Sequence, residues 1–541
     1  GKALDIKPLA GDLFEYNAID ILNECDLDNE IFMQCFRKLS IFRNEDTKST
    51  IRINYAALNV EEFGSIYEGL LEFKPSITKL VGMWEYNLVK GSERSSSGSH
   101  YTPDELVKPL IKHSLDYIIE DKLKEPDKEK ALLSIKVCDV ACGSGHILLN
   151  AARRIAFELA IIREKAEQPS PGPLRIAMRD VIKSCIYGVD KNELAVELCK
   201  IALWLESHNP GEPLSFLDHR IRCGDSIVGL AHKEELERGI ATEAFKELPG
   251  DNKAIAAELR KQNTVEVKNR HQVTLQFKET VDSNIKELSV KVIEITGLSE
   301  HSPDEVRTKK NKYEELRKRG ELWRLKVLAD IQVAQFFLPK TIKNKLLTDQ
   351  EYLKLKTSQQ LLGDGVYAAM SIAVDKKFFH WFLEFPDVFE HGGFDCIIGN
   401  PPYLGVKRLS GHFGDNFLEW VKYEFNPVGG VDLVAYFFRR IYQIINQKSY
   451  LSLIATNTIS QGSTRQGGLE VIINNNGSII FAIKSMKWPG VANVVVSLIA
   501  IYKGSWERGR YLNYRYVQKI NSYLSDSTVI GNPFELYQNI D

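Results

Sequence analysis

A strand, a glycine turn and the start of a helix follow one another over residues 137–149, and this order strongly constrains the fold. Such a unit is typical of open α/β sheets, which bind ligands at the carboxyl ends of their strands. Gly143 and Gly145 let the backbone approach a ligand closely. The spacing differs from the G-x-G-x-x-G fingerprint for a pyrophosphate. The turn therefore favours a nucleoside cofactor without phosphates.

A second apolar run, Phe394–Gly399, leads directly into the turn Asn400-Pro401-Pro402-Tyr403. An amine on a planar ring is a poor nucleophile, and two fixed acceptors on its protons would redirect its lone pair. The Asn400 side-chain oxygen and the Pro401 carbonyl can be these acceptors. Two prolines keep the turn stiff and remove competing N–H donors, and Tyr403 offers a flat face for a base. The alternative is an ordinary Asn-Pro turn with a packed tyrosine.

Two more predicted strands, Ser184–Asp190 and Arg220–Asp225, each end in a carboxylate. Asp190 is placed to accept both hydroxyls of a ribose, as acidic residues do after the second strand of Rossmann-type sites. Carboxylates at strand ends also cap helices, so each has a structural alternative. In this order, with the glycine turn, they predict a nucleoside pocket.

The order of these motifs resembles a γ-class S-adenosylmethionine-dependent N6-adenine DNA methyltransferase of the restriction-modification or BREX- or DISARM-like phage-defence type. The resemblance covers roughly residues 60 to 505, with further matches at Phe378–Pro386 and Asp432–Phe438. Two departures are Val140, where the family usually has proline, and Trp488, where many relatives place a phenylalanine against the flipped base.

The resemblance implies S-adenosyl-L-methionine as cofactor, with Asp225 binding the cofactor's adenine amine. The cofactor-binding residues it implies are Tyr101, Thr102, Pro103, Asp139, Ala141, Cys142, Gly143, Ser144, Gly145, Asp190, Lys191, Asp225 and Ser226, and the catalytic residues are Asn400, Pro401, Pro402 and Tyr403. The expected reaction is methyl transfer to the N6 amine of an adenine flipped out of double-stranded DNA, in restriction-modification or antiviral defence. Other subunits of a defence system are further expected partners.

Net charge decides where DNA can bind. With 70 basic and 72 acidic residues among 541, the net charge of −2 argues against a protein that coats nucleic acid indiscriminately. The densest basic stretch, Arg307–Lys326, is interrupted by glutamates and reads as a solvated helix face. Residues at predicted strand ends are better candidates for contacts to DNA or the base, with plain surface charges and a core tryptophan as the alternatives: Lys407, Arg408, Arg465, Lys484, Lys487 and Trp488.

The eight cysteines are scattered, without a C-x-x-C pair or a histidine at ligand spacing. We interpret them as buried apolar residues in a reducing compartment and expect no metal site. No apolar run is long enough to span a bilayer, and the first residues do not begin a secretory signal. We therefore expect a cytoplasmic protein without a membrane partner.

The predicted fold class is α/β, with a Rossmann-like, seven-stranded, mainly parallel sheet, an N-terminal helical region and a long helical insertion. The expected divisions are 1–95 mainly helical, 96–230 the cofactor half, 231–370 the helical insertion, 371–505 the catalytic half and 506–541 the start of a target-recognition region. The remaining sheet strands are predicted at 450–455, 478–483 and 494–502.

Two other kinds of function remain open from the sequence. The same tetrapeptide serves methylation of cytosine N4, guanine N2 in RNA and the glutamine amide, because all present a planar amine. The other possibility is a DNA-binding subunit that senses the cofactor without turnover. Such a protein would need the cofactor pocket but not the catalytic turn. No Walker loop, helicase signature or complete nuclease triad is visible, so a built-in motor or endonuclease is not expected.

Overall fold

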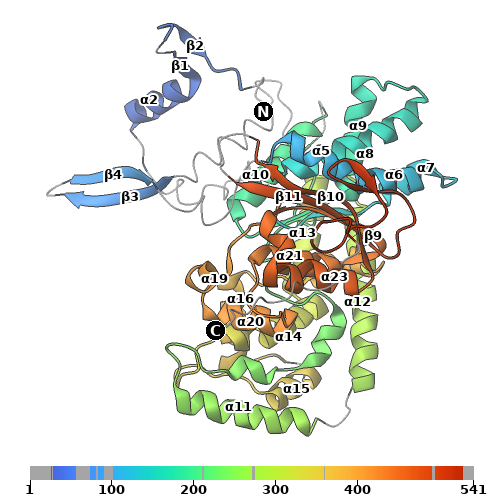
Figure 1. Ribbon diagram of the computed structural model, residues 1–541. Helices are drawn as coiled ribbons and strands as arrows, with labels where there is room; N and C mark the ends of the chain where they lie inside the picture. The colour runs from blue at the N-terminus through green and yellow to red at the C-terminus, as the bar shows by residue number, and fades with distance from the viewer. Residues whose placement is uncertain are drawn as a thin grey trace, which may run out of the picture.

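The computed structural model describes residues 26, 28–44, 46–55, 73–80, 83–90, 102–209, 213–270, 274–358, 360–489 and 494–527. Its centre is one nine-stranded sheet in the order β13-β12-β10-β11-β9-β8-β5-β6-β7 (Figure 1). The strand order reverses beside β5, because β6 and β7 lie on one side of it and β8 and β9 on the other. This is the switch point at which open α/β sheets form ligand sites.

Seven strands lie where the sequence predicted them: β5 (Val137–Asp139), β6 (Ile186–Asp190), β7 (Ile221–Cys223), β8 (Phe394–Gly399), β9 (Ile445–Thr456), β10 (Gly477–Lys487) and β11 (Val495–Lys503). From β7 to β9 all neighbours pair in parallel, whereas β11 is antiparallel to both β9 and β10. The predicted total of seven is wrong, because β12 (Arg510–Leu512) and β13 (Arg515–Val517) extend the edge beyond β10.

Helices of the cofactor half cover one face of the sheet, and their bounds are α5 (Asp104–Lys112), α6 (Leu115–Lys122), α7 (Lys128–Leu133), α8 (His146–Glu164), α9 (Pro171–Cys185) and α10 (Glu193–Glu206). Their apolar sides share one core with alternate residues of the strands, among them Val137 of β5 and Ile398 of β8. The residues adjacent to these two, Cys138 and Ile397, point into a second core on the other face. A strand that is apolar on both sides is buried on both faces, as expected for a central parallel strand.

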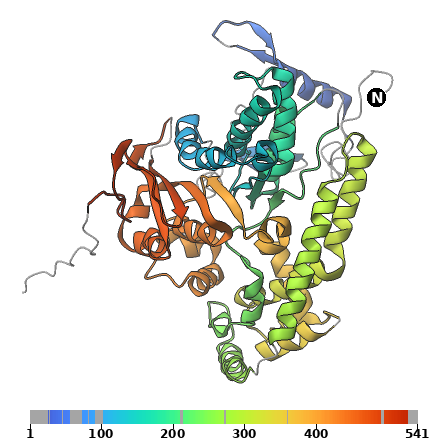
Figure 2. The same ribbon diagram turned by 90° about the vertical axis from the view of Figure 1, so that its right-hand side faces the viewer.

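The second core is covered largely by helices between β7 and β8: η5 (Lys233–Arg238), η6 (Thr242–Phe245), α11 (Lys253–Lys268), α12 (Thr274–Thr296), α13 (Pro303–Lys318), α14 (Gly320–Phe337), α15 (Asp349–Thr357), α16 (Asp364–Lys376), α17 (Trp381–Glu384) and α18 (Pro386–Phe389). Figure 2 shows α12 and α13, in yellow-green, standing along one side of the molecule. The α14 helix is buried along nearly its whole length and packs against other helices of this insertion, among them α13, α15 and α16. The helical character predicted for this segment is confirmed.

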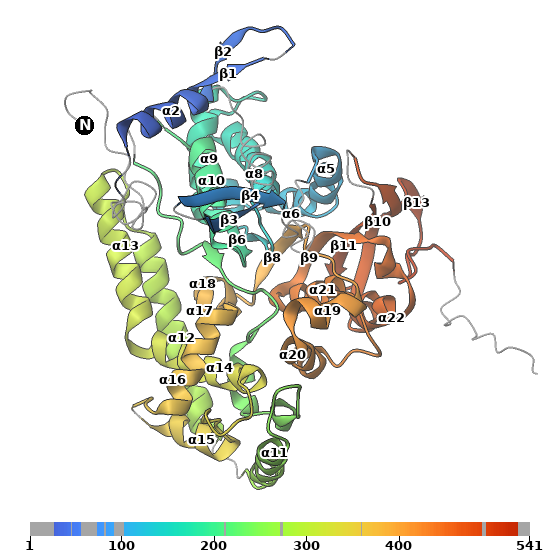
Figure 3. The ribbon, with the colours of Figure 1, turned by 90° about the vertical axis from the view of Figure 1, so that its left-hand side faces the viewer.

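After β8 the chain forms α19 (Val406–Phe413), α20 (Asp415–Phe425) and α21 (Leu433–Ile444), and after β9 it forms η7 (Asn457–Ser460), α22 (Gly462–Arg465), η8 (Gln466–Glu470) and α23 (Val471–Asn474). The α21 helix begins at Asp432, whose side chain accepts a hydrogen bond from the Val434 N–H and so caps the first turn. Figure 3 shows α19 to α21 gathered beside the ends of β8 and β9.

The described part of the first 95 residues holds one helix, α2 (Asn29–Ser40), and two antiparallel hairpins. The hairpins are β1 (Ile41–Arg43) with β2 (Thr50–Arg52), and β3 (Phe73–Leu80) with β4 (Met83–Lys90). The prediction of a mainly helical region is therefore wrong for the described residues. The domain boundaries themselves stay predictions.

Glu384 holds the insertion to the sheet through a buried ion triad. Arg317 of α13 donates two hydrogen bonds to its carboxylate, at 2.7 and 3.1 Å, and Arg222 of β7 lies 3.0 Å away. Burial by itself would raise the pKa of Glu384, but the two guanidinium groups hold it well below its usual range. Three segments far apart in the sequence thus depend on one charged group.

Replacing this carboxylate should weaken the fold. Glu384→Gln leaves two partly buried guanidinium groups without an anion, so we expect a loss of about 3 kcal/mol in the free energy of unfolding. Because the folded pKa is lowered, the stabilisation is complete above the ordinary pKa of 4.5 and declines only as pH falls below it. Urea unfolding at pH 7 measures the change. Exposed Glu258→Gln on α11 is the control, and equal midpoints for the two variants would contradict the role of Glu384.

A nucleoside-sized pocket at the switch point

The glycine turn after β5 is shaped by a close approach to α10. Gly145 has φ +86°, in the left-handed region, and a Cβ there would lie 2.7 Å from the Cys199 sulfur. Only glycine fits both restrictions without strain. The Gly143 N–H donates a hydrogen bond of 2.9 Å to Asp190 Oδ2, which ties the turn to the end of β6. The sequence therefore brings the turn and the strand-end carboxylate together as predicted.

Two strand-end carboxylates face the same cavity with different surroundings. Asp190 accepts the N–H groups of Gly143 and Asn192, one on each oxygen, and each oxygen keeps a lone pair. Asp225, at the end of β7, accepts the Ile227 N–H and pairs with the Lys191 ammonium at 2.8 Å. Burial raises the pKa of Asp190, and its two backbone N–H donors oppose that shift.

Asn400 follows β8, which runs parallel to and directly beside β5. A Cβ on Gly399 would lie 2.7 Å from Asp139 Oδ1, so the absence of a side chain there lets the two strand ends meet. The Asn400 amide donates to the Thr102 hydroxyl at 3.2 Å, and its oxygen accepts the Tyr403 hydroxyl at 2.5 Å. These two bonds fix the carboxamide on both sides. Its oxygen has a second lone pair for another donor.

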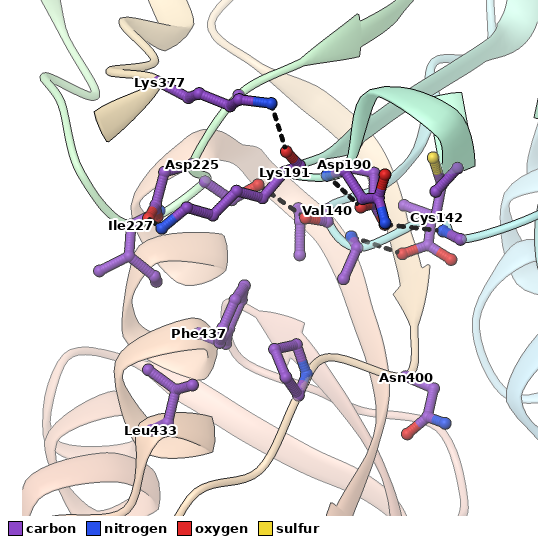
Figure 4. A pocket seen from close by; sticks show the side chains of 18 of the residues that line it. Val140, Cys142, Asp190, Lys191, Asp225, Ile227, Lys377, Asn400, Leu433 and Phe437 are labelled. Atoms are coloured by element: carbon purple, nitrogen blue, oxygen red, sulfur yellow. Dashed lines mark hydrogen bonds and ion pairs between the residues drawn. The ribbon is translucent and has the colours of Figure 1, made fainter. Parts of the chain in front are cut away.

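One cavity of about 600 Å³ joins these groups. Figure 4 shows Asp225 and Lys191 on one side of it and Asn400 across from them. The predicted site residues that line it are Thr102, Asp139, Ala141, Cys142, Gly143, Ser144, Asp190, Lys191, Asp225, Ser226, Asn400 and Pro402. Pro103, Gly145, Pro401 and Tyr403 support the lining from outside, and Tyr101 lies outside the described residues.

Several lining residues were not named from the sequence as contacts. Leu433 and Phe437 line the cavity from α21, as Figure 4 shows. His412 and Phe413 close it from the end of α19, and Lys377 donates to the Lys191 carbonyl at 3.2 Å. The apolar spacing of α21 in the sequence could have indicated that Phe437 lies on the buried face of a helix. No local pattern indicates that α19 lines the cavity.

The residues proposed to contact DNA divide into two groups. Lys407 and Arg408 are exposed on α19, and Lys484 and Lys487 are exposed at the carboxyl end of β10. Arg465 was wrongly predicted to be a surface contact, because its side chain is only 2% exposed and binds Glu470 and Ser522.

Trp488 is likewise buried, within the core of the cofactor-half face, and is not among the residues that line the cavity. Trp488 is therefore a core tryptophan at a strand end, which is the alternative to a contact with the base. The predicted burial of the cysteines is confirmed for Cys138, Cys142, Cys185, Cys199 and Cys396. It is wrong for Cys35, which is exposed, and Cys223 is only partly buried. Every described cysteine is a free thiol.

In the described part of the chain, no group of three or more side chains is arranged to hold a metal ion. Nor is any helix among the described residues both long and apolar enough to cross a membrane. The cavity's chemistry is instead that of carboxylates, a clamped carboxamide and apolar walls.

Curated proteins with known names are similar to this chain in sequence. A type II restriction enzyme and methyltransferase from Methanocaldococcus jannaschii is 24% identical over 488 residues, covering 74% of this chain and 34% of that protein. DNA methyltransferase A of Bacillus subtilis is 26% identical over 197 residues, covering 32% of this chain and 20% of that protein. The chain thus spans about a third or less of the length of these relatives.

Among solved structures, the type IIL restriction-modification enzyme MmeI in complex with DNA aligns with 88% of this chain and 46% of its own, at 15% identity and a TM-score of 0.42. The family model for N-6 DNA methylases matches residues 76–234. The resemblance inferred from the motifs is confirmed, since a second model matches residues 184–484, more than half of the 541 residues, and the chain therefore belongs to the Eco57I restriction-modification methylase family.

Proposed function

We propose that this chain transfers the methyl group of S-adenosylmethionine to the N6 amine of an adenine flipped out of double-stranded DNA, in a restriction-modification or phage-defence system. The observation that carries the proposal is the clamped Asn400 carboxamide, which faces the same cavity as the carboxylates of Asp190 and Asp225. A nucleoside site and an amine acceptor thus share one enclosed space.

The cavity fits the proposed cofactor in size and chemistry. Its volume of about 600 Å³ lies within the range of small-molecule sites. The turn from Ala141 to Gly145 carries no lysine or arginine, which suits a ligand without phosphates. Asp190 would hold the ribose hydroxyls and Asp225 the adenine amine, with Phe437 as an apolar wall. When bound, S-adenosylmethionine supplies an electrophilic methyl group on a positively charged sulfur.

The chain's own contribution to the reaction is a pair of oriented acceptors. Thr102 accepts the Asn400 amide, so the carboxamide oxygen is turned away from Thr102 and toward the turn. In the described residues no hydrogen bond reaches the Pro401 carbonyl, so this acceptor is unused, although Pro401 itself does not line the cavity. Two acceptors on one amine withdraw its lone pair from the ring and aim it at the methyl group.

Positive charge grows on the amine nitrogen as the new bond forms. Acceptors already fixed around that nitrogen stabilise the transition state more than the ground state. Tyr403 contributes through its hydroxyl on Asn400, and the exposed part of its ring offers a face for the base. Once the nitrogen is alkylated it is acidic, so its proton can leave to solvent without a strong base.

Base identity distinguishes adenine from the other planar amines. Long-read mapping of modified bases in cells with and without the protein reports the base and its sequence context together. We expect N6-methyladenine at one recurring sequence. Modified cytosine at that sequence, or no modified DNA, would contradict the proposal.

Two substitutions separate catalysis from cofactor binding. Asn400→Ala removes one acceptor, so we expect methyl transfer to fall by at least about a hundredfold with unchanged cofactor affinity. Asp190→Ala should instead weaken cofactor binding. Calorimetry and tritium-methyl transfer to unmethylated DNA measure the two quantities, and an active Asn400→Ala enzyme would refute the assignment.

Tyr403→Phe tests the clamp on Asn400. The phenyl ring keeps the shape and loses only the hydroxyl that Asn400 accepts. We expect kcat to fall about tenfold with unchanged cofactor affinity, because the carboxamide loses one of its two fixing bonds. Tyr403→Ala, which also removes the ring, should fall further. Equal kcat values for Tyr403→Phe and the wild type would show that the hydroxyl does not orient Asn400.

Asp139 gives cofactor binding a pH dependence. Burial raises its pKa to about 7, although the Ala141 N–H opposes the shift. Its charge favours the cationic cofactor, so affinity should rise roughly tenfold from pH 6 to pH 8. Its raised folded pKa also lowers stability as pH rises from 3.8 toward 7, since the folded state binds the proton more tightly.

Calorimetry at both pH values, on the wild type and Asp139→Asn, tests this expectation. The variant should bind the cofactor weakly at both pH values and should be the more stable protein at pH 8. A wild-type affinity that is constant from pH 6 to 8 would contradict the role of Asp139.

A further inference from the structure

The β12–β13 hairpin has no part in the pocket or in the proposed reaction. Its turn, Asn513–Tyr514, has φ angles of +48° and +65°. This is the geometry of tight hairpin turns, which strongly prefer glycine at the second position. A tyrosine there costs conformational energy, and such outliers cluster at functional sites. Tyr514 therefore calls for an explanation beyond the folding of the turn.

The register of the sheet places this turn level with the catalytic turn. The pairs run across five strands in one row: Gly399 of β8 with Leu453 of β9, Leu453 with Ile499 of β11, Ile499 with Ala482 of β10, and Ala482 with Leu512 of β12. Asn400 follows the first residue of this row, and Asn513 follows the last. Because β8 and β12 run in the same direction, both turns lie on the side of the sheet where these strands have their carboxyl ends.

The separation between the two turns matches a length of DNA. Four strand spacings lie between β8 and β12, which is about 19 Å along the sheet. A duplex rises about 3.4 Å per base pair, so this distance corresponds to roughly five or six base pairs. A duplex with its target base at Asn400 would pass the hairpin on one flank.

Side chains around the hairpin tip suit a polyanion. Tyr514 is 66% exposed and Arg515 follows it on the surface. The Lys484 N–H donates to the Asn513 side chain at 3.0 Å, which fixes the end of β10 against the tip. Lys484, Lys487 and Arg515 are exposed and form no ion pair with any described residue. Free cations beside an exposed aromatic ring are typical of nucleic-acid contacts.

We propose that the tip of the β12–β13 hairpin binds the backbone of duplex DNA that flanks the target adenine. Lys484, Lys487 and Arg515 contact phosphates, and Tyr514 lies against the sugar and phosphate of the same strand. The turn presents the ring at the surface next to Phe481 of β10, with the two ring centroids 6.3 Å apart, where a glycine turn would present no side chain. This inference rests on the proposed function for the identity of the DNA, and adds a second contact remote from the flipped base.

Two variants test the hairpin. Tyr514→Gly removes the ring and relieves the strained φ, so the turn should fold at least as well as in the wild type. The triple variant Lys484→Gln, Lys487→Gln, Arg515→Gln removes the cations. The matched control replaces three exposed lysines of α11 that form no ion pair with any described residue: Lys253→Gln, Lys261→Gln, Lys268→Gln.

Fluorescence anisotropy with a labelled 30-base-pair duplex, measured from 50 to 200 mM salt, reads out binding by the full chain. We expect the hairpin triple variant to bind DNA at least tenfold more weakly at 50 mM salt. The slope of the logarithm of the binding constant against the logarithm of the salt concentration should become shallower by about 2 to 3, because each lost phosphate contact contributes about 0.9. Tyr514→Gly should weaken binding about threefold or more. The α11 control should bind like the wild type, and cofactor affinity should be unchanged throughout.

The outcomes separate this inference from the proposed function. If the wild type methylates DNA but both hairpin variants bind it unchanged, or if the α11 control loses as much affinity as the hairpin triple, the hairpin contact is overturned. If the wild type neither binds nor methylates duplex DNA, the proposed function itself fails. Thermal unfolding of Tyr514→Gly confirms that a loss of binding reflects the missing ring.

Discussion

The parallel pairing of β5 with β8 is the constraint on which the whole site depends. It joins Val137 to Cys396 and Cys138 to Ile397, so that Asp139 and Gly399 end side by side. Because Gly399 has no side chain, the carboxylate of Asp139 can lie closer to it than a Cβ would allow, with Oδ1 only 2.7 Å from where that Cβ would be. Asn400 then follows at the mouth of the cofactor half. One glycine thus sets the spacing between the pocket and the turn that carries Asn400.

The helical insertion contributes to this arrangement from a distance. It leaves the sheet after β7 at one edge and returns to β8 near the centre, and Glu384 ties its α13 helix back to β7. Lys377, at its end, also contacts the Lys191 carbonyl beside the pocket. The insertion is therefore part of the structure that holds the strand ends around the pocket in place.

Residues that act within their own segment could be predicted from sequence, and residues that act through distant partners could not. Strand ends followed by glycine, aspartate or asparagine could be identified from the sequence because their local patterns are strong, as at Gly145 and Asn400. The bond between Asn400 and Thr102 joins positions almost 300 residues apart, and Arg465 looked exposed because Ser522 and Glu470 are not visible as its partners. The β12 strand has only three residues and, unlike the equally short β5 and β7, is not followed by a glycine turn or an aspartate that would mark its end.

The β5–β8 pairing also bears on how the chain is made. On the ribosome, β5 emerges some 250 residues before its neighbour β8, and until then one edge of the cofactor half has no hydrogen-bonding partner. Closing so long a loop is slow, and an open strand edge invites pairing with other chains in the meantime. Nascent copies of this chain therefore pass through a period in which the open strand edge can aggregate and in which protection by chaperones matters most.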